Sequence, residues 1–144
     1  MTAQNYANHR KFVFGFHGVL FGLLIVTLIG CGVNLWKSIG DHQRVYSASL
    51  LMVLTGCILM LFFFCRIFAL KAQDRAIRAE ENLRHYVMTG KLLDPRLTVR
   101  QIIGLRFASD DEFPALVKRA AEEGLSEDAI KRTVKNWRAD EYRV

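Results

Sequence analysis

The chain has 144 residues, enough for one or two small units, and its formal net charge is +6. Two long segments, residues 12–36 and 45–65, contain no Asp, Glu, Lys or Arg, and this pattern excludes an ordinary soluble globular protein. From Lys71 onward, fifteen Lys and Arg stand against thirteen Asp and Glu. The basic excess therefore lies mainly at the edges of the apolar segments, where it can meet anionic lipid headgroups.

The two uncharged segments are each long enough to cross a bilayer. A helix rises about 1.5 Å per residue and a hydrocarbon core is about 30 Å thick. The sequence therefore predicts two transmembrane helices, at about residues 12–36 and 45–67, in a hairpin of residues 12–70. A cleaved signal peptide has a shorter apolar region and a small-residue cleavage site, whereas Trp36 and Lys37 follow the first segment. We expect the first helix to remain in the membrane.

Small residues in both predicted spans indicate helix packing. Gly18 and Gly22 have the small-xxx-small spacing that lets helices approach closely. We expect the hairpin to pack through Gly15, Gly18 and Gly22, and through Ser49 and Gly56 of the second span.

His17 lies among these glycines and is the ionisable residue of the first span. It can donate or accept a hydrogen bond in helix packing, or it can be the axial ligand of a pigment or haem. A bis-histidine haem needs a second histidine at matching depth, and the second span has none. The pattern favours hydrogen bonding and no cofactor, with a further functional role left open.

The flanking charges predict which side each end occupies. The connection at residues 37–44 carries only two cations, Lys37 and Arg44. The opposite ends of the spans carry Arg10, Lys11, Arg66, Lys71, Arg75, Arg78 and Arg84. Because Lys and Arg flanks stay in the cytoplasm, we expect both termini to be cytoplasmic, including a tail at residues 1–11.

The second span is expected to continue as a cytoplasmic extension helix at residues 71–90, because no Pro or Gly occurs before Gly90. Asp74 with Arg78, and Glu80 with Arg84, have the spacing of i,i+4 ion pairs. A stripe at three- and four-residue steps predicts a seam for a partner helix, or else a solvated face. This partner-helix seam comprises Ala69, Ala72, Ala76, Ala79, Leu83 and Tyr86.

Residues 91–144 predict a small module of three short helices. Thr98 is a plausible N-cap for the first, Ser109 and Glu112 have capping-box spacing for the second, and Ser126 caps the third. Gly124 would end the second helix. The expected inward residues of the third are Ile130, Val134 and Trp137. With no strand pattern anywhere, the predicted fold class is all-α: a transmembrane helical hairpin, an extended second helix and this module.

The sequence contains no nucleophile elbow, phosphate loop or metal-ligand spacing, so we expect a protein that is not an enzyme and holds no metal. The turn at Gly124 also has features of a helix-turn-helix, in which Lys131, Arg132, Lys135 and Arg138 could face phosphates. Acidic residues surround that turn, namely Glu122, Glu123, Glu127 and Asp128. They argue against nucleic acid as the partner, although a membrane-tethered regulator remains an alternative.

The segments NYANHRKF, DPRLTVRQIIGLRFASDDEF and GLSEDAIKRTVKNWRADEYRV resemble a family of small bacterial two-span membrane proteins of unknown function, some labelled transporter permeases. The resemblance covers nearly the whole chain and implies the bacterial inner membrane. Our leading hypothesis is a non-catalytic accessory, structural or assembly subunit of a larger complex, with lipids and other membrane-protein subunits or further copies as partners. The alternatives are the regulator and a pigment- or haem-bearing subunit using His17.

Overall fold

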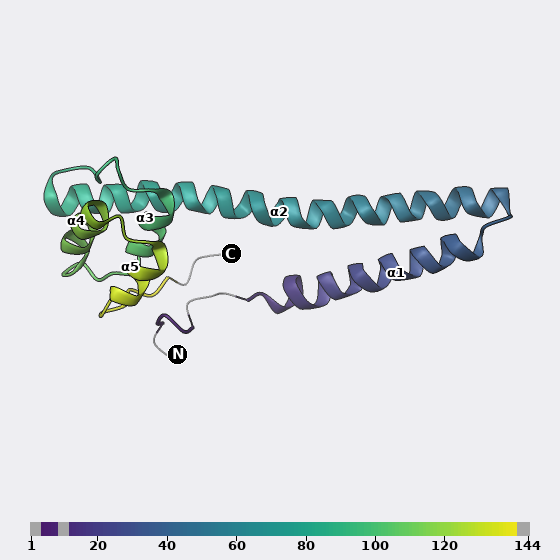
Figure 1. Ribbon diagram of the computed structural model, residues 1–144, viewed down its shortest axis with the longest axis horizontal. Coiled ribbons are helices and arrows are strands. Elements are labelled where there is room, and N and C mark those ends of the chain that lie inside the picture. The colour runs from purple at the N-terminus through teal and green to yellow at the C-terminus, as the bar shows by residue number, and fades with distance from the viewer. Residues whose placement is uncertain (1–3, 9–11, 141–144) are drawn as a thin grey trace. The chain divides into compact units, whose positions relative to one another are not determined.

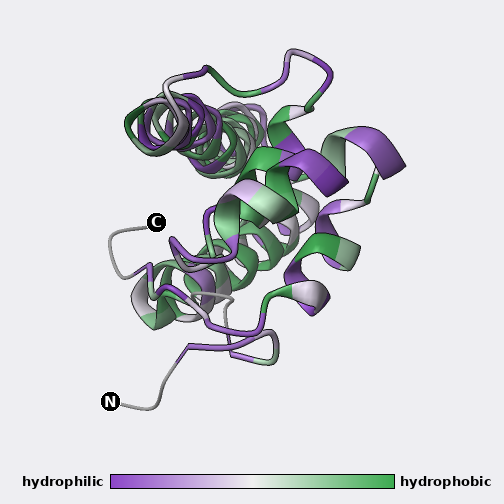
Figure 2. Cartoon of the chain, turned by 90° about the vertical axis from the view of Figure 1, so that its left-hand side faces the viewer, coloured by the Kyte–Doolittle hydropathy of each residue, from purple (hydrophilic) through white to green (hydrophobic). Residues whose placement is uncertain are grey.

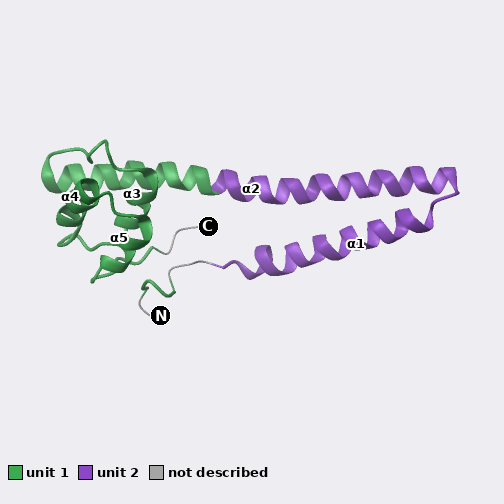
Figure 3. Ribbon diagram, in the orientation of Figure 1, with its two compact units in different colours: residues 1–11, 70–144 green, residues 12–69 purple. Residues whose placement is uncertain are grey.

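The computed structural model describes residues 4–8 and 12–140, which form helices without a strand (Figure 1). The predicted all-α class is confirmed. The chain divides into two compact units: unit 2 comprises residues 12–69, and unit 1 comprises residues 70–144 with residues 1–11 (Figure 3). Arg10 and Lys11 of the predicted cytoplasmic flank lie outside the described residues.

Unit 2 is a helical hairpin. It begins with the π-helix η1 (Phe14–Leu20), which continues directly into α1 (Phe21–Lys37). After residues 38–41, α2 (His42–Thr89) begins, three residues earlier than the predicted span. The Asp41 carboxylate accepts a hydrogen bond from the backbone N–H of Arg44 at 3.1 Å, so it caps the helix at this point. Gly40, with φ of +102°, provides the left-handed conformation of the turn.

The two helices of unit 2 contact each other along one face of each. The least exposed residues on these faces are Leu24, Ala48 and Thr55. Cys31 Sγ lies 3.4 Å from Thr55 Oγ1. The rings of Phe16 and Phe62 stack with centroids 4.2 Å apart. The contact therefore combines small residues with an aromatic pair.

The other faces of these helices carry large exposed hydrophobic residues. Leu23, Val26 and Ile29 of α1 are each at least 60 % exposed. The segment Phe14–Lys37 and helix α2 are both long and apolar enough to cross a membrane. A stable hairpin with so much exposed apolar surface needs a covering of lipid or protein.

Unit 1 packs the C-terminal part of α2 with α3 (Val99–Leu105), α4 (Phe113–Glu123) and α5 (Glu127–Thr133). Hydrophobic and hydrophilic residues alternate along these helices (Figure 2). The core includes Ile77 of α2 together with Leu97, Ile102, Ile103, Leu105, Ala108, Phe113, Leu116, Val117, Ala120, Ile130 and Val134. A Cβ on Gly104 would lie 3.1 Å from the Glu127 carbonyl oxygen, so this glycine allows α3 and α5 to approach closely.

Three of the predicted helix ends are confirmed. Thr98 and Gln101 form a complete capping box at the start of α3. Ser126 Oγ accepts the backbone N–H of Ala129 at 3.2 Å at the start of α5. Gly124 ends α4 in the left-handed conformation, with φ of +61°.

The predicted start of α4 is wrong. Ser109 and Glu112 are not its capping box, because the helix begins at Phe113. The Glu112 carboxylate instead accepts the backbone N–H groups of Lys135 and Asn136 at 3.2 and 2.8 Å. A long-range contact to the segment after α5 has replaced the local cap.

The third predicted helix is shorter than its apolar pattern suggests. It ends at Thr133, so Trp137 follows the helix rather than lying on its face. Trp137 forms an isolated antiparallel bridge with Ala108, and its ring lies 4.9 Å from the ring of Phe107. The residue still contributes to the core, but through an extended segment.

Candidate interaction surface

Arg84 of α2 connects that helix to the segment before α4. Its Nε and Nη2 donate to Asp110 Oδ1 at 2.9 and 2.6 Å, and Nη2 also donates to the Ala108 carbonyl at 2.8 Å. Its Nη1 donates to Glu81 Oε2 at 2.9 Å. The guanidinium also lies 4.1 Å from the Phe113 ring centroid. Arg84 thus pairs with Glu81, and the predicted pair with Glu80 is replaced because Arg84 points toward the core.

The hydrogen bonds between Arg84 and Asp110 predict that part of the stability of unit 1 depends on pH. The hydrogen bonds from Arg84 lower the pKa of the Asp110 carboxyl below its ordinary value. A lowered folded-state pKa adds stability above the unfolded pKa, and this contribution is lost as the pH falls through the folded value. We therefore expect Asp110→Asn to flatten the fall in melting temperature as the pH drops below the ordinary Asp pKa of about 4. Thermal unfolding in mild detergent measures it. Asp111→Asn, at the exposed neighbouring residue, is the control. Equal slopes of melting temperature against pH in the two variants would contradict the prediction.

Gln4 and Tyr6, near the N-terminus, contact the C-terminal part of unit 1. Gln4 Oε1 accepts the backbone N–H of Asp140 at 2.8 Å. The Tyr6 hydroxyl accepts a hydrogen bond from Arg132 at 3.3 Å, and the Arg132 guanidinium lies 5.2 Å from the Tyr6 ring centroid. Residues from the two ends of the chain therefore contribute to the same unit.

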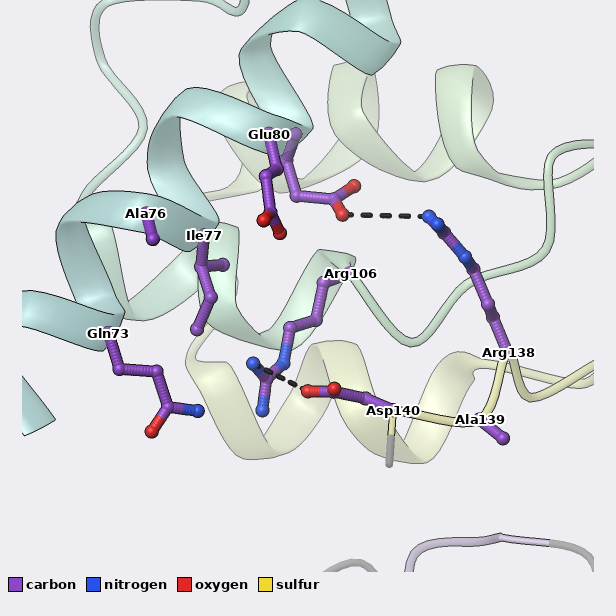
Figure 4. Close-up of a pocket in the computed structure, with 9 residues that line it drawn as sticks. Gln73, Ala76, Ile77, Glu80, Arg106, Arg138, Ala139 and Asp140 are labelled. Atoms are coloured by element: carbon purple, nitrogen blue, oxygen red, sulfur yellow. Dashed lines mark ion pairs between the residues drawn. The ribbon is translucent and has the colours of Figure 1, made fainter. Parts of the chain in front are cut away.

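A charged pocket of about 180 Å³ lies between α2 and the segments at residues 106 and 138–140 (Figure 4). Arg106 pairs with Asp140 at 2.7 Å, and Arg138 approaches Glu81 at 3.7 Å. Burial lowers the pKa of Arg106, and the nearby Asp140 charge opposes this shift. Among the residues that the structure describes, Arg106 Nε and Gln73 Oε1 are buried without a hydrogen-bond partner. The pocket has room for several water molecules that could satisfy them.

The predicted partner-helix seam is exposed along its whole length. All six of its residues are exposed, and Leu83 and Tyr86 are 63 % and 52 % exposed. The C-terminal helices pack instead on a different face of α2, the one that contains Ile77, Glu81 and Arg84. Helices α3–α5 therefore leave the seam open to another molecule.

The predicted glycine contacts do not form between the two helices of unit 2. Gly15 and Gly22 are exposed, and a Cβ on either would meet no atom within 4 Å. A Cβ on Gly18 would meet only the neighbouring Phe14 ring, at 3.3 Å. Ser49 Oγ donates to the Tyr46 carbonyl of its own helix, and Gly56 has open space around it. Packing of these residues against another molecule stays a prediction.

His17 lies in the π-helix η1, where its Nδ1 is 3.1 Å from both the N and the O of Val13. Its ring stacks on Phe12 at 5.0 Å and meets Phe16 edge-on at 5.2 Å. Short π-helical segments are rare and often occur at functional sites. Within the described part of the chain, no group of three or more His, Cys, Asp or Glu residues could hold a metal ion.

The basic residues of the candidate helix-turn-helix make contacts within unit 1. Lys131 is buried and pairs with Glu127 at 2.6 Å. Arg132 contacts Tyr6, and Arg138 approaches Glu81. Lys135 is exposed. Three of the four cations therefore have intramolecular roles that compete with phosphate binding.

Sequence reasoning missed the Glu81–Arg84–Asp110 cluster and the pocket. Helical periodicity offered a signal for Glu81, because it places Glu81 with Ile77 and Arg84 on a face of α2 that points away from the seam. No local signal links Arg84 to Asp110, which lie 26 positions apart.

No curated protein and no solved structure matches the chain. A family of unknown function matches the chain over residues 1–144, in agreement with the resemblance described above. The chain belongs to DUF6526, a family of unknown function.

Proposed function

We propose that the chain is a non-catalytic integral membrane protein of the bacterial inner membrane, acting as an accessory or assembly subunit of a larger complex. The observation that carries this proposal is the pair of long apolar helices in unit 2, whose large side chains are mostly exposed. Lipid and the spans of other subunits would cover that surface.

The proposed orientation places both termini in the cytoplasm. Two spans return the chain to its starting side, which agrees with the hydrogen bond between Gln4 and the Asp140 backbone. Lys71, Arg75 and Arg78 are exposed just beyond the second span, as the positive-inside rule requires for a cytoplasmic segment. These residues can also interact with anionic headgroups.

The accessory role rests on the exposed apolar faces of unit 2, and the seam adds a surface for a helix of a further copy or subunit. An exposed apolar stripe on a long helix is a surface for a partner helix rather than for solvent. Lys131 is buried and pairs with Glu127, and His17 contacts Val13 and the neighbouring rings. These contacts favour the accessory role over the regulator and pigment alternatives.

Membrane fractionation and topology reporters test the location. The chain should stay in the pellet after carbonate extraction, and reporters fused after residue 144 and at Gly40 should lie on opposite sides. Release by carbonate, or a C-terminal reporter outside the cell, would contradict the proposal.

Purification in mild detergent with mass spectrometry tests the accessory role. Other membrane subunits should co-purify with the wild type, and their yield should fall in Leu23→Ala with Val26→Ala, which truncates exposed side chains of α1. They should be retained by Arg78→Ala, the control outside unit 2. A chain that purifies without any other subunit would contradict the accessory role.

A further inference from the structure

We propose that the partner-helix seam of α2 binds the same seam of a second copy of this chain, forming a parallel two-stranded coiled coil. This inference rests on the proposed membrane location and names the partner for the seam described above. It is carried by three features of residues 69–86: the spacing of the apolar residues, their exposure, and the charges on either side of them.

The spacing is that of a coiled coil. Ala69, Ala76 and Leu83 are seven residues apart, and Ala72, Ala79 and Tyr86 follow each of them by three. These two sets occupy the a and d positions of consecutive heptads, the pattern by which two helices pack knobs into holes. The alanines permit close approach near the membrane, and the exposed Leu83 and Tyr86 supply larger contacts at the far end.

The flanking charges fit a parallel pair of identical helices. In this register Arg75 occupies a g position and Glu80 the e position five residues later. In a parallel coiled coil, a g residue lies beside the e residue of the next heptad of the other helix. Arg75 would therefore approach Glu80 of the partner subunit, and the symmetry of the dimer repeats the pair.

Neither charge is paired with another residue in the described part of the chain. Arg75 and Glu80 are both exposed, and neither has an ion pair with another described residue. Glu80 lies at the edge of the charged pocket, where Gln73 Oε1 also has no donor among the described residues (Figure 4). A guanidinium of the partner subunit beside Glu80 would supply the opposite charge that Glu80 lacks among the described residues.

Membrane insertion favours the same arrangement. Two copies inserted in the same orientation have parallel α2 helices, so the parallel register needs no further constraint. The C-terminal helices pack on the face that contains Ile77, Glu81 and Arg84. The seam can therefore close without displacing them.

Cysteine cross-linking of the full chain in native membranes tests the interface. The natural Cys31, Cys57 and Cys65 are first replaced by serine, and Ala72→Cys and Ala79→Cys are introduced separately. Both should form disulfide-linked dimers on mild oxidation, and two differently tagged copies should appear in one product. Arg78→Cys, an exposed residue outside the seam, should give at least about tenfold less dimer. No dimer from either seam variant, or linkage only to a different protein, would overturn the inference.

A charge exchange tests the register. Arg75→Glu or Glu80→Arg alone places like charges at both pairs and should weaken association about tenfold. The double exchange restores opposite charges and should return association to within about threefold of the wild type. Equal dimer yields in all four proteins would overturn the parallel register.

The inference and the proposed function fail separately. Release by carbonate would refute the membrane location whether or not dimers form. A chain that stays in the membrane with other subunits but never cross-links at Ala72 and Ala79 would refute only the dimer.

Discussion

Arg84→Ala is expected to lower the free energy of unfolding of unit 1 by about 3–5 kcal/mol, the range for breaking one side of a buried ion pair. The substitution leaves the Glu81 carboxylate, whose side chain is only 6 % exposed, with the more distant Arg138 at 3.7 Å. It also removes the donors to Asp110 and to the Ala108 carbonyl. A buried charge without a close partner destabilises far more than a lost surface pair.

Trp137 fluorescence reports this unfolding locally, provided that Trp36 of unit 2 is first replaced by phenylalanine. Denaturant titration in mild detergent then gives the stability of unit 1. Arg78→Ala is the matched control, because Arg78 is an exposed arginine of the same helix and should cost less than about 0.5 kcal/mol. If the two variants have the same denaturant midpoint, Arg84 does not connect α2 to the segment before α4 as described.

Phe107→Ala is the second substitution for which we expect a large effect, again about 3–5 kcal/mol. Phe107 is 1 % exposed, and its ring contacts Trp137 and lies 4.7 Å from the Arg106 guanidinium. Removing the ring leaves a cavity beside the Trp137 ring and the Arg106 guanidinium, and neither group can easily move to fill it. The same denaturant titration, followed by far-UV circular dichroism because Trp137 itself contacts the ring, measures the loss.

Leu92→Ala is the control for that experiment. Leu92 is 64 % exposed, so truncation removes a similar kind of apolar group without leaving a cavity, and the expected change is below about 0.5 kcal/mol. A Phe107→Ala protein as stable as this control would show that the ring does not belong to the core.

Local signals predicted the helices well. The absence of charge over residues 12–36 and 45–65 indicated two long apolar helices. Thr98, Gly124 and Ser126 marked helix ends correctly because each acts on backbone groups within three or four residues. The same reasoning failed at Glu112. Its carboxylate does not cap α4 but accepts the backbone N–H groups of Lys135 and Asn136, more than twenty residues away.

The candidate surface was predictable only in part. The seam was visible in the spacing of its alanines, because helical periodicity depends on sequence alone. The packing of α3–α5 on the face of α2 that contains Ile77 could not be predicted from the sequence. Both faces of α2 carry suitable residues, and only the tertiary contacts of Arg84 distinguish them. The pocket likewise depends on Arg106 and Asp140, which are brought together by packing.

Unit 1 is assembled from both ends of the chain, with residues 12–69 between its two parts. Gln4 and Tyr6 are synthesised 136 and 126 residues before their partners Asp140 and Arg132. These contacts can therefore form only after both long apolar helices and the segment through residue 140 have been translated. A message truncated before codon 132 would yield a polypeptide in which Gln4 and Tyr6 lack these partners. The segment that contains them would then stay exposed to quality-control proteases.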